Sequence, residues 1–167
     1  SVMLEKTLGV TLVTKLRAIL LMEADFNATN KIIYGCRMMG KAREHGLIPK
    51  EIFSERNRMA DDGTLSKTLF CDLARQARAP AAIASVDASN CYDRIAHAMA
   101  SLVFQAFGVP DTAVESMLGA IENMKFFLRT GFGDSTSFAG GGVSIKTQGM
   151  CQGNGAAPAA WLATSIP

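Results

Sequence analysis

One short segment, ASVDASNCYDRIAH at 84–97, combines acidic and aromatic residues with a run of small apolar ones. Asp87 ends the apolar run, and Tyr92 and Asp93 follow closely. A carboxylate at the end of a strand is a suitable ligand for Mg²⁺, which binds one or two protein carboxylates together with substrate phosphates. The segment therefore predicts a bend at which a metal ion and a phosphate could bind.

The turn after Asp87 strengthens this interpretation. Its backbone amides at 88–91, with the positive end of the helix expected next, could receive a triphosphate. Tyr92 would then stand where a sugar ring must lie. From these residues alone a structural role stays open, in which the polar side chains cap a helix and Asp93 favours its dipole.

Composition narrows the classes of protein. The chain has 167 residues, of which 49% are apolar and 19% charged, enough for one domain with a core. No apolar run reaches the roughly 18 residues that cross a bilayer, and the N-terminus lacks the order of a signal peptide. We expect a soluble intracellular protein, cytoplasmic or nuclear, with no membrane partner. The four cysteines and two histidines lack zinc-site spacing, which predicts reduced thiols.

Charge is distributed unevenly. Residues 1–78 carry 13 Lys and Arg against 9 Asp and Glu, whereas residues 79–167 carry 4 against 6. This asymmetry suits a protein that binds a polyanion with one part and metal ions with another, and a solvated helix face explains it nearly as well.

Hydrophobic periodicity predicts the elements of the first half. The apolar run at 18–22 fits a buried strand or the start of a helix. Residues 26–45 predict a helix, 51–63 a surface loop, and the segment from Asp62 to Ala79 a further helix.

In the second half, residues 81–87 predict a covered strand followed at once by a helix. The stripe of that helix is Ile95, Met99, Leu102 and Ala106. The next helix is expected to start with the capping box Thr112-x-x-Glu115 and to bury Val114, Met117, Leu118, Ile121 and Met124.

A β-hairpin and a closing helix are predicted for the remaining residues. The hairpin pairs Phe126 and Leu128 with Val143, Ile145 and Thr147. Glycines 140–142 also invite a phosphate-loop interpretation, which the lack of a following GKS or GKT disfavours. The closing helix tolerates Pro158 only in its first turn. These elements together predict an α+β fold, with helices behind a small antiparallel sheet.

Two further segments, QGMCQGNGAAP at 148–158 and LRAILLMEADFNATNK at 16–31, complete a recognisable order. With 87–93 they resemble the reverse transcriptase family, most closely the non-LTR retrotransposon type. Residues 87–93 are similar to its first palm motif and 149–158 to its second, a G-x-x-Q-G run closed by a small residue and proline. Residues 17–31 resemble its fingers motif, and 48–64 its linking segment against the template.

The resemblance implies the fingers, at 1–80, and a partial palm, at 81–167, of a right-hand polymerase. It implies an RNA-directed DNA polymerase that transfers a nucleotide from dNTP to a primer 3′-hydroxyl. The implied partners are an RNA template, a DNA primer and dNTP. The implied cofactor is Mg²⁺ in a two-metal site.

Individual roles follow from the same resemblance. Asp87 is the expected catalytic metal ligand, with the carbonyl of Ala88 as a second metal and nucleotide contact. Arg17 is expected to clamp the triphosphate, since a guanidinium pairs with phosphate oxygens in fork geometry, and Lys15 is a weaker candidate. An exposed strand-edge arginine is the alternative.

Three more residues are expected around the base and sugar. Gln152 would rest its amide against the incoming nucleotide or the template base. Gly153, like Gly149, would let backbone approach nucleic acid. Tyr92 would collide with a ribose 2′-hydroxyl and so favours deoxynucleotides.

The chain also departs from the family pattern. The family's third palm motif, aromatic-x-Asp-Asp, does not occur in this sequence. The only adjacent acids, Asp61-Asp62, lie before the first palm motif and so cannot be its counterpart. Ala18 and Ala157 replace the usual proline and serine. We therefore expect a fragment of a longer polymerase that is inactive alone. The alternatives are a non-catalytic RNA-binding relic and, less favoured, an RNA-dependent RNA polymerase.

Overall fold

The computed structural model describes residues 1–5, 9, 12, 16–55, 57–130, 132–141 and 147–166. Its helices and four-stranded sheet confirm the α+β class in this coarse form. The chain divides into two compact units, one of residues 1–47 with 90–167 and one of residues 48–89. This division does not follow the boundary expected at residue 80, and the assignment of fingers and palm stays a prediction.

In the larger unit, a long helical run confirms the helix predicted at 26–45. It consists of α1 (Ala24–Asn30), the π-helical η2 (Lys31–Met38) and α2 (Met39–Glu44). Its buried side chains recur at helical spacing and define one face: Asn30, Tyr34, Met38, Met39 and Ala42.

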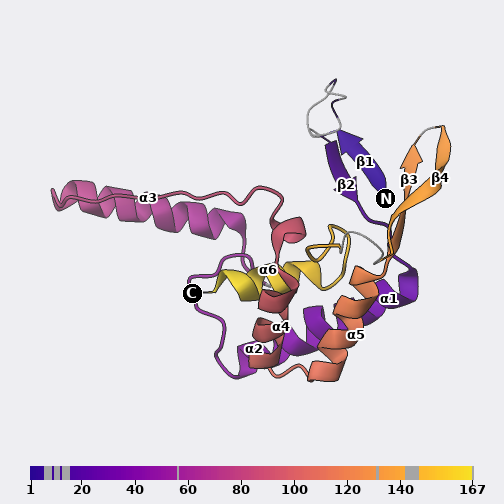
Figure 1. Ribbon diagram of the computed structural model, residues 1–167. Helices are drawn as coiled ribbons and strands as arrows, with labels where there is room; N and C mark the ends of the chain where they lie inside the picture. The colour runs from indigo at the N-terminus through magenta and orange to yellow at the C-terminus, as the bar shows by residue number, and fades with distance from the viewer. Residues whose placement is uncertain are drawn as a thin grey trace. The chain divides into compact units, whose positions relative to one another are not determined.

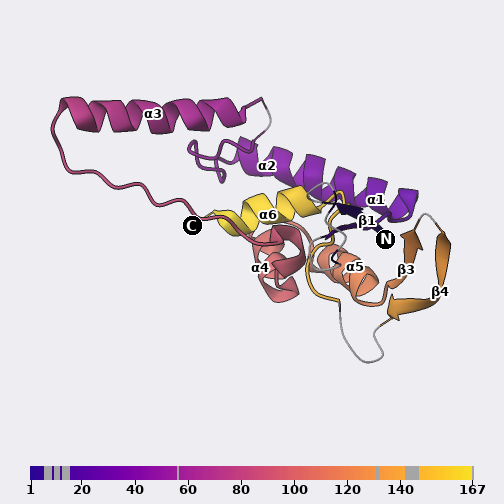
Figure 2. The same cartoon turned by 90° about the horizontal axis from the view of Figure 1, so that it is seen from above.

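The core of this unit lies between helices. It contains η3 (Cys91–Arg94, a 3₁₀ turn), α4 (His97–Ala106), α5 (Asp111–Glu122) and α6 (Ala157–Ser165). Helix α6 packs against η2 and against α4 (Figures 1 and 2). The ring centroids of Tyr34 and Phe104 lie 4.9 Å apart, and the Tyr34 hydroxyl donates 2.8 Å to the carbonyl of Ala113.

Of the predicted core stripe, Ile95 is buried as expected, and the prediction was wrong for Met99, Leu102 and Ala106, which are exposed. Met99 and Leu102 are exposed at 52% and 65%, whereas Ala100 and Phe104 are fully buried. The reason is a break at Ile95, whose backbone is extended at ψ 116°. Because the helix starts only at His97, Ile95 is out of phase with the residues that follow.

Helix α5 buries the predicted Val114, Met117, Leu118 and Ile121. Met124 lies beyond its end and is half-buried. The capping box was wrong, since no side chain caps this helix. Pro110 occupies the N-cap and the helix begins at Asp111, so Thr112 lies inside the first turn. The closing helix holds Pro158 in its first turn, as predicted.

The sheet has the strand order β2-β1-β3-β4, with strands Val2–Glu5, Leu16–Ile19, Lys125–Thr130 and Gly133–Gly140 numbered along the chain. Its β1–β3 pairing is parallel and the other two are antiparallel, so the sheet is mixed rather than antiparallel. Within the described ranges, no strand residue belongs to the buried core. The hairpin is confirmed, but its second strand is Gly133–Gly140. Thr147 lies outside it, and Val143 and Ile145 fall outside the described residues.

The smaller unit contains α3 (Ala60–Gln76), a helix without buried residues. It begins two residues before the expected Asp62, whose carboxylate accepts a hydrogen bond from the Met59 amide at 2.8 Å.

The strand predicted at 81–87 was wrong, because residues 79–88 form no regular secondary structure and are exposed. Val86, for example, is 93% exposed. An isolated extended segment has no ladder hydrogen bonds, and its small side chains offer little area to bury.

Candidate functional site

A tight loop at Gly149–Asn154 carries Gln152 and is tied to two other segments by its backbone. The amide of Met150 donates 2.8 Å to the carbonyl of Tyr92 in η3. The carbonyl of Gln152 accepts 2.8 Å from the amide of Leu20, directly after β2. Main-chain hydrogen bonds therefore join the segments around residues 20, 92 and 152.

Two glycines make this close approach geometrically accessible. Gly149 and Gly153 have φ values of +79° and +118°, which side-chain-bearing residues rarely adopt. A Cβ on Gly149 would lie 2.5 Å from the backbone of Asp93, and one on Gly153 would collide with the carbonyl oxygen of Leu20. The resemblance implies that these glycines let the backbone approach nucleic acid, which stays a prediction. In the structure they accommodate the backbone of Asp93 and of Leu20.

His97 closes the first side of the loop. Its Nε2 lies 2.8 Å from the carbonyl oxygen of Gly149, and its Nδ1 lies 3.0 Å from Glu122 Oε1 at the end of α5. The side chain is 13% exposed. One imidazole thus links α4, α5 and the loop.

Asparagines hold the other side, at the start of α6. The Asn154 side-chain oxygen accepts from the Asn30 amide at 3.1 Å and from the backbone amide of Ala156 at 3.0 Å. The Gly155 amide donates 2.6 Å to Asn27 Oδ1. The side chains of Asn27, half-buried, and Asn30, buried, on the long helix therefore fix where the loop enters α6.

Cys151 lies inside the loop and is buried, with a left-handed φ of +61°. Burial raises the pKa of its thiol to about 11, and the negative charge of Asp93 acts in the same direction. The thiol is therefore neutral and unreactive at physiological pH, which suits packing rather than nucleophilic chemistry.

The Gln152 side chain remains available for a ligand. It is half-buried, and its amide makes no hydrogen bond to any residue that the structure describes. Arg17 is similarly available on β2, opposite Leu4, with an exposed guanidinium. Tyr92 is half-buried and Gly153 exposed.

The remaining predicted site residues lie elsewhere. Lys15 falls outside the described residues. Asp87 and Ala88 belong to the smaller unit, where both are exposed. That Asp87 faces one pocket with Gln152 and Arg17 stays a prediction. The expected phosphate site needs the start of a helix directly after the bend. A 3₁₀ turn follows instead, and the α-helix begins only at His97.

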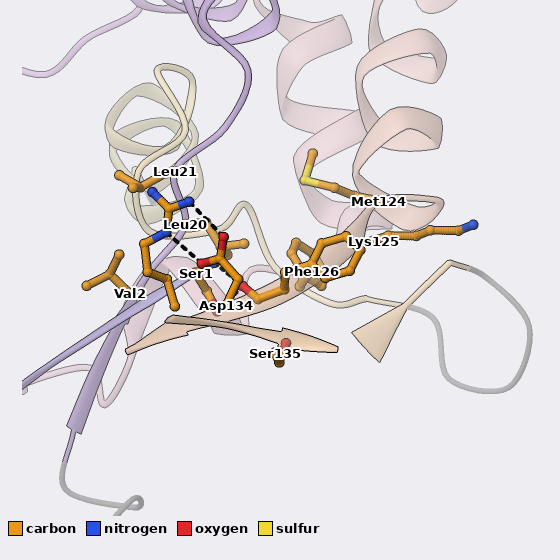
Figure 3. A pocket seen from close by; sticks show the side chains of 11 residues that line it. Ser1, Val2, Leu20, Leu21, Met124, Lys125, Phe126, Asp134 and Ser135 are labelled. Carbon is orange, nitrogen blue, oxygen red and sulfur yellow. Dashed lines mark hydrogen bonds and ion pairs between the residues drawn. The ribbon is translucent and has the colours of Figure 1, made fainter. Parts of the chain in front are cut away.

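A pocket of about 590 Å³ lies in the larger unit, beside the loop (Figure 3). The residues after β2, the chain start and the β3–β4 hairpin form its walls, and Leu20 belongs both to it and to the loop contact. Asp134 and Arg129 form a bidentate ion pair on one wall, at 2.7 and 2.9 Å, which lowers the pKa of Asp134. None of the predicted site residues that the structure describes lines this pocket.

Sequence reasoning missed the residues that hold the loop. His97 was considered only as a metal ligand, and the helix that it begins was expected to start directly after Asp87. Asn154 carried no signal apart from its place beside the glycines. Both act through contacts between residues far apart in the chain, which periodicity does not reveal.

Among the described residues, no three His, Cys, Asp or Glu side chains gather as a metal site would require. No helix in the described ranges is both long enough and apolar enough to cross a bilayer. Comparisons with protein-family models, with curated proteins and with solved structures give no match to this chain.

Proposed function

We propose that this chain is the nucleotide- and template-contacting part of a reverse transcriptase, an RNA-directed DNA polymerase of a retroelement. In that reaction a primer 3′-hydroxyl attacks the α-phosphate of a dNTP on an RNA template. One observation carries the proposal: the two 2.8 Å backbone hydrogen bonds that join Tyr92, Gln152 and the end of β2. They bring together three segments that resemble separate motifs of one family.

The available side chains support the same assignment. The uncommitted amide of Gln152 can donate and accept against a base or sugar. The exposed guanidinium of Arg17 keeps its charge and can pair with phosphate oxygens. Tyr92 is the proposed barrier to a ribose 2′-hydroxyl.

Mg²⁺ is the cofactor that the resemblance implies, and the described residues do not form a site that fits it. Asp87 is exposed in a segment without regular structure, and no cluster of carboxylates completes a site in the described ranges. The acid pair Asp61-Asp62 lies in the first turn of α3, where Asp62 caps the helix. We assign no metal-dependent step to this chain, and we expect negligible polymerase activity from it alone.

Binding rather than turnover therefore tests the proposal. Fluorescence anisotropy would follow a labelled DNA primer annealed to an RNA template, with and without the next complementary dNTP. We expect that dNTP to tighten binding, and expect Gln152→Ala and Arg17→Ala to abolish the effect. Arg37→Ala, which removes an exposed helical arginine of the same charge, is the matched control. The affinity should also fall steeply with salt.

Two outcomes would count against a polymerase. Binding of RNA that no dNTP affects, with Gln152→Ala equal to Arg37→Ala, would favour the RNA-binding relic. A preference for NTP over dNTP would favour an RNA-dependent RNA polymerase. Under the proposal, Tyr92→Val instead reduces the discrimination against the ribonucleotide.

A further inference from the structure

The His97 side chain reaches the loop from α4 and bonds to a carbonyl group of it. Gly149 O, Met150 N and Gln152 O bond to His97, Tyr92 and Leu20 in turn. They fall within four consecutive residues. Two of these residues, Gly149 and Cys151, have positive φ values, so the path between the anchors is an unusual one.

The chemistry of the two partners fixes what the imidazole must do. A peptide carbonyl only accepts hydrogen bonds, so the nitrogen facing it needs a proton. The Nε2–H therefore donates to the carbonyl of Gly149, and Nδ1 lies 3.0 Å from Glu122 Oε1. Other titratable groups beside the loop include Tyr92 and Asp93, in η3, and the buried thiol of Cys151.

Losing the bond to Gly149 would free the most adaptable residue of the loop. Glycine populates both signs of φ, so without this anchor its peptide can rotate. That rotation would move the Met150 amide, which is bonded to Tyr92, and with it the residues leading to Gln152. The contact to Glu122, by contrast, ties α4 to α5 and does not touch the loop.

We infer that His97 is a positioning residue, which sets the place of Gln152 by donating a hydrogen bond from Nε2 to the carbonyl of Gly149. That Gln152 is placed to contact a nucleotide rests on the proposed function. The hydrogen bond between His97 and Gly149 does not depend on it.

Two isosteric variants separate the contacts. Glutamine places its amide near the position of Nε2, and asparagine places it near the position of Nδ1. His97→Gln should keep the bond to Gly149, and His97→Asn should keep only the bond to Glu122. His45→Gln, at an exposed turn, is the control for losing a histidine.

Amide hydrogen exchange measured by NMR gives the readout without any nucleotide. In His97→Asn we expect the Met150 and Leu20 amides to exchange at least tenfold faster, a change of about 1.4 kcal/mol. In His97→Gln and His45→Gln the exchange rates of these amides should stay within about threefold of those in the unmodified chain. A change of about tenfold or more counts as an effect. The Ile121 amide in α5 serves as the reference for global opening.

The inference is overturned if the two His97 variants accelerate the loop amides equally, or if neither does. A Glu122→Gln variant covers the case in which His97→Asn does not fold. This substitution removes the carboxylate beside Nδ1 and leaves the Gly149 contact. The exchange rates of the Met150 and Leu20 amides should therefore change by less than about threefold, below the tenfold criterion. A tenfold acceleration there would contradict the inference. Failure of dNTP binding alone would reject the proposed function and leave this result standing.

Discussion

Replacing Gly149 by alanine tests the packing of the loop most directly. The substitution adds one methyl group at a φ of +79°, with its Cβ 2.5 Å from the backbone of Asp93. A left-handed backbone costs an L-residue about 1–2 kcal/mol, and forcing an atom into a filled space costs about 1–3 kcal/mol. We expect Gly149→Ala to lower the free energy of unfolding by about 2–5 kcal/mol, the sum of these two ranges.

Two other glycines separate these contributions. Gly108 has a φ of +81°, and no atom lies within 4 Å of the place that an added methyl group would take, so Gly108→Ala should lose only the backbone cost of about 1–2 kcal/mol. Gly119 lies inside α5 with ordinary helical φ and equally open space. Gly119→Ala should raise stability by about 0.5–1 kcal/mol, because alanine favours a helix.

Urea unfolding followed by the fluorescence of Trp161 measures all three changes. It is the single tryptophan of the chain and lies in α6, in the same compact unit as the loop. With a slope of about 1–3 kcal/mol per molar urea, the predicted loss for Gly149→Ala moves the midpoint by roughly 1 M or more. If Gly149→Ala unfolds at the same midpoint as Gly108→Ala, the close approach to Asp93 is refuted.

Two further predictions concern the core. Burial raises the pKa of Tyr34 from 10.0 to about 12, so stability present below pH 10 should fall by about 2–3 kcal/mol as the pH rises from 10 to 12. Tyr34→Phe should cost about 1 kcal/mol below pH 10 and lack this drop; parallel unfolding curves for the two proteins would contradict it. Phe104→Ala, at a fully buried position, should cost about 3–5 kcal/mol, whereas Leu102→Ala should stay within about 0.5 kcal/mol by the same urea assay. Equal losses of unfolding free energy in the two variants would contradict this and would support burial of Leu102, as the sequence predicted.

Helices with a steady apolar period were predictable because their burial follows from local spacing. Helix α5 shows this, because the predicted Val114, Met117, Leu118 and Ile121 are buried in it. The phase of α4 was not predictable, since the break at Ile95 displaces its start. The strand expected at 81–87 failed because small apolar residues indicate a strand only where a partner strand pairs with them.

The candidate site was predictable in part. Tyr92, Gln152, Gly149 and Gly153 were named from the resemblance, and backbone hydrogen bonds join the segments of Tyr92 and Gln152. Their roles stay predictions. The residues that fix the loop were not, because the His97 contact spans 52 positions and the Asn30–Asn154 contact spans 124. The place of Asp87 relative to this loop stays a prediction.

Because main-chain atoms, rather than the Gln152 amide, secure the Gly149–Asn154 loop, stability and selectivity are separable at this position. Exchanging Gln152 for another polar residue leaves each anchor of the loop in place. A substitution of the Gln152 side chain can therefore test the proposed nucleotide contact while these backbone hydrogen bonds keep the loop folded.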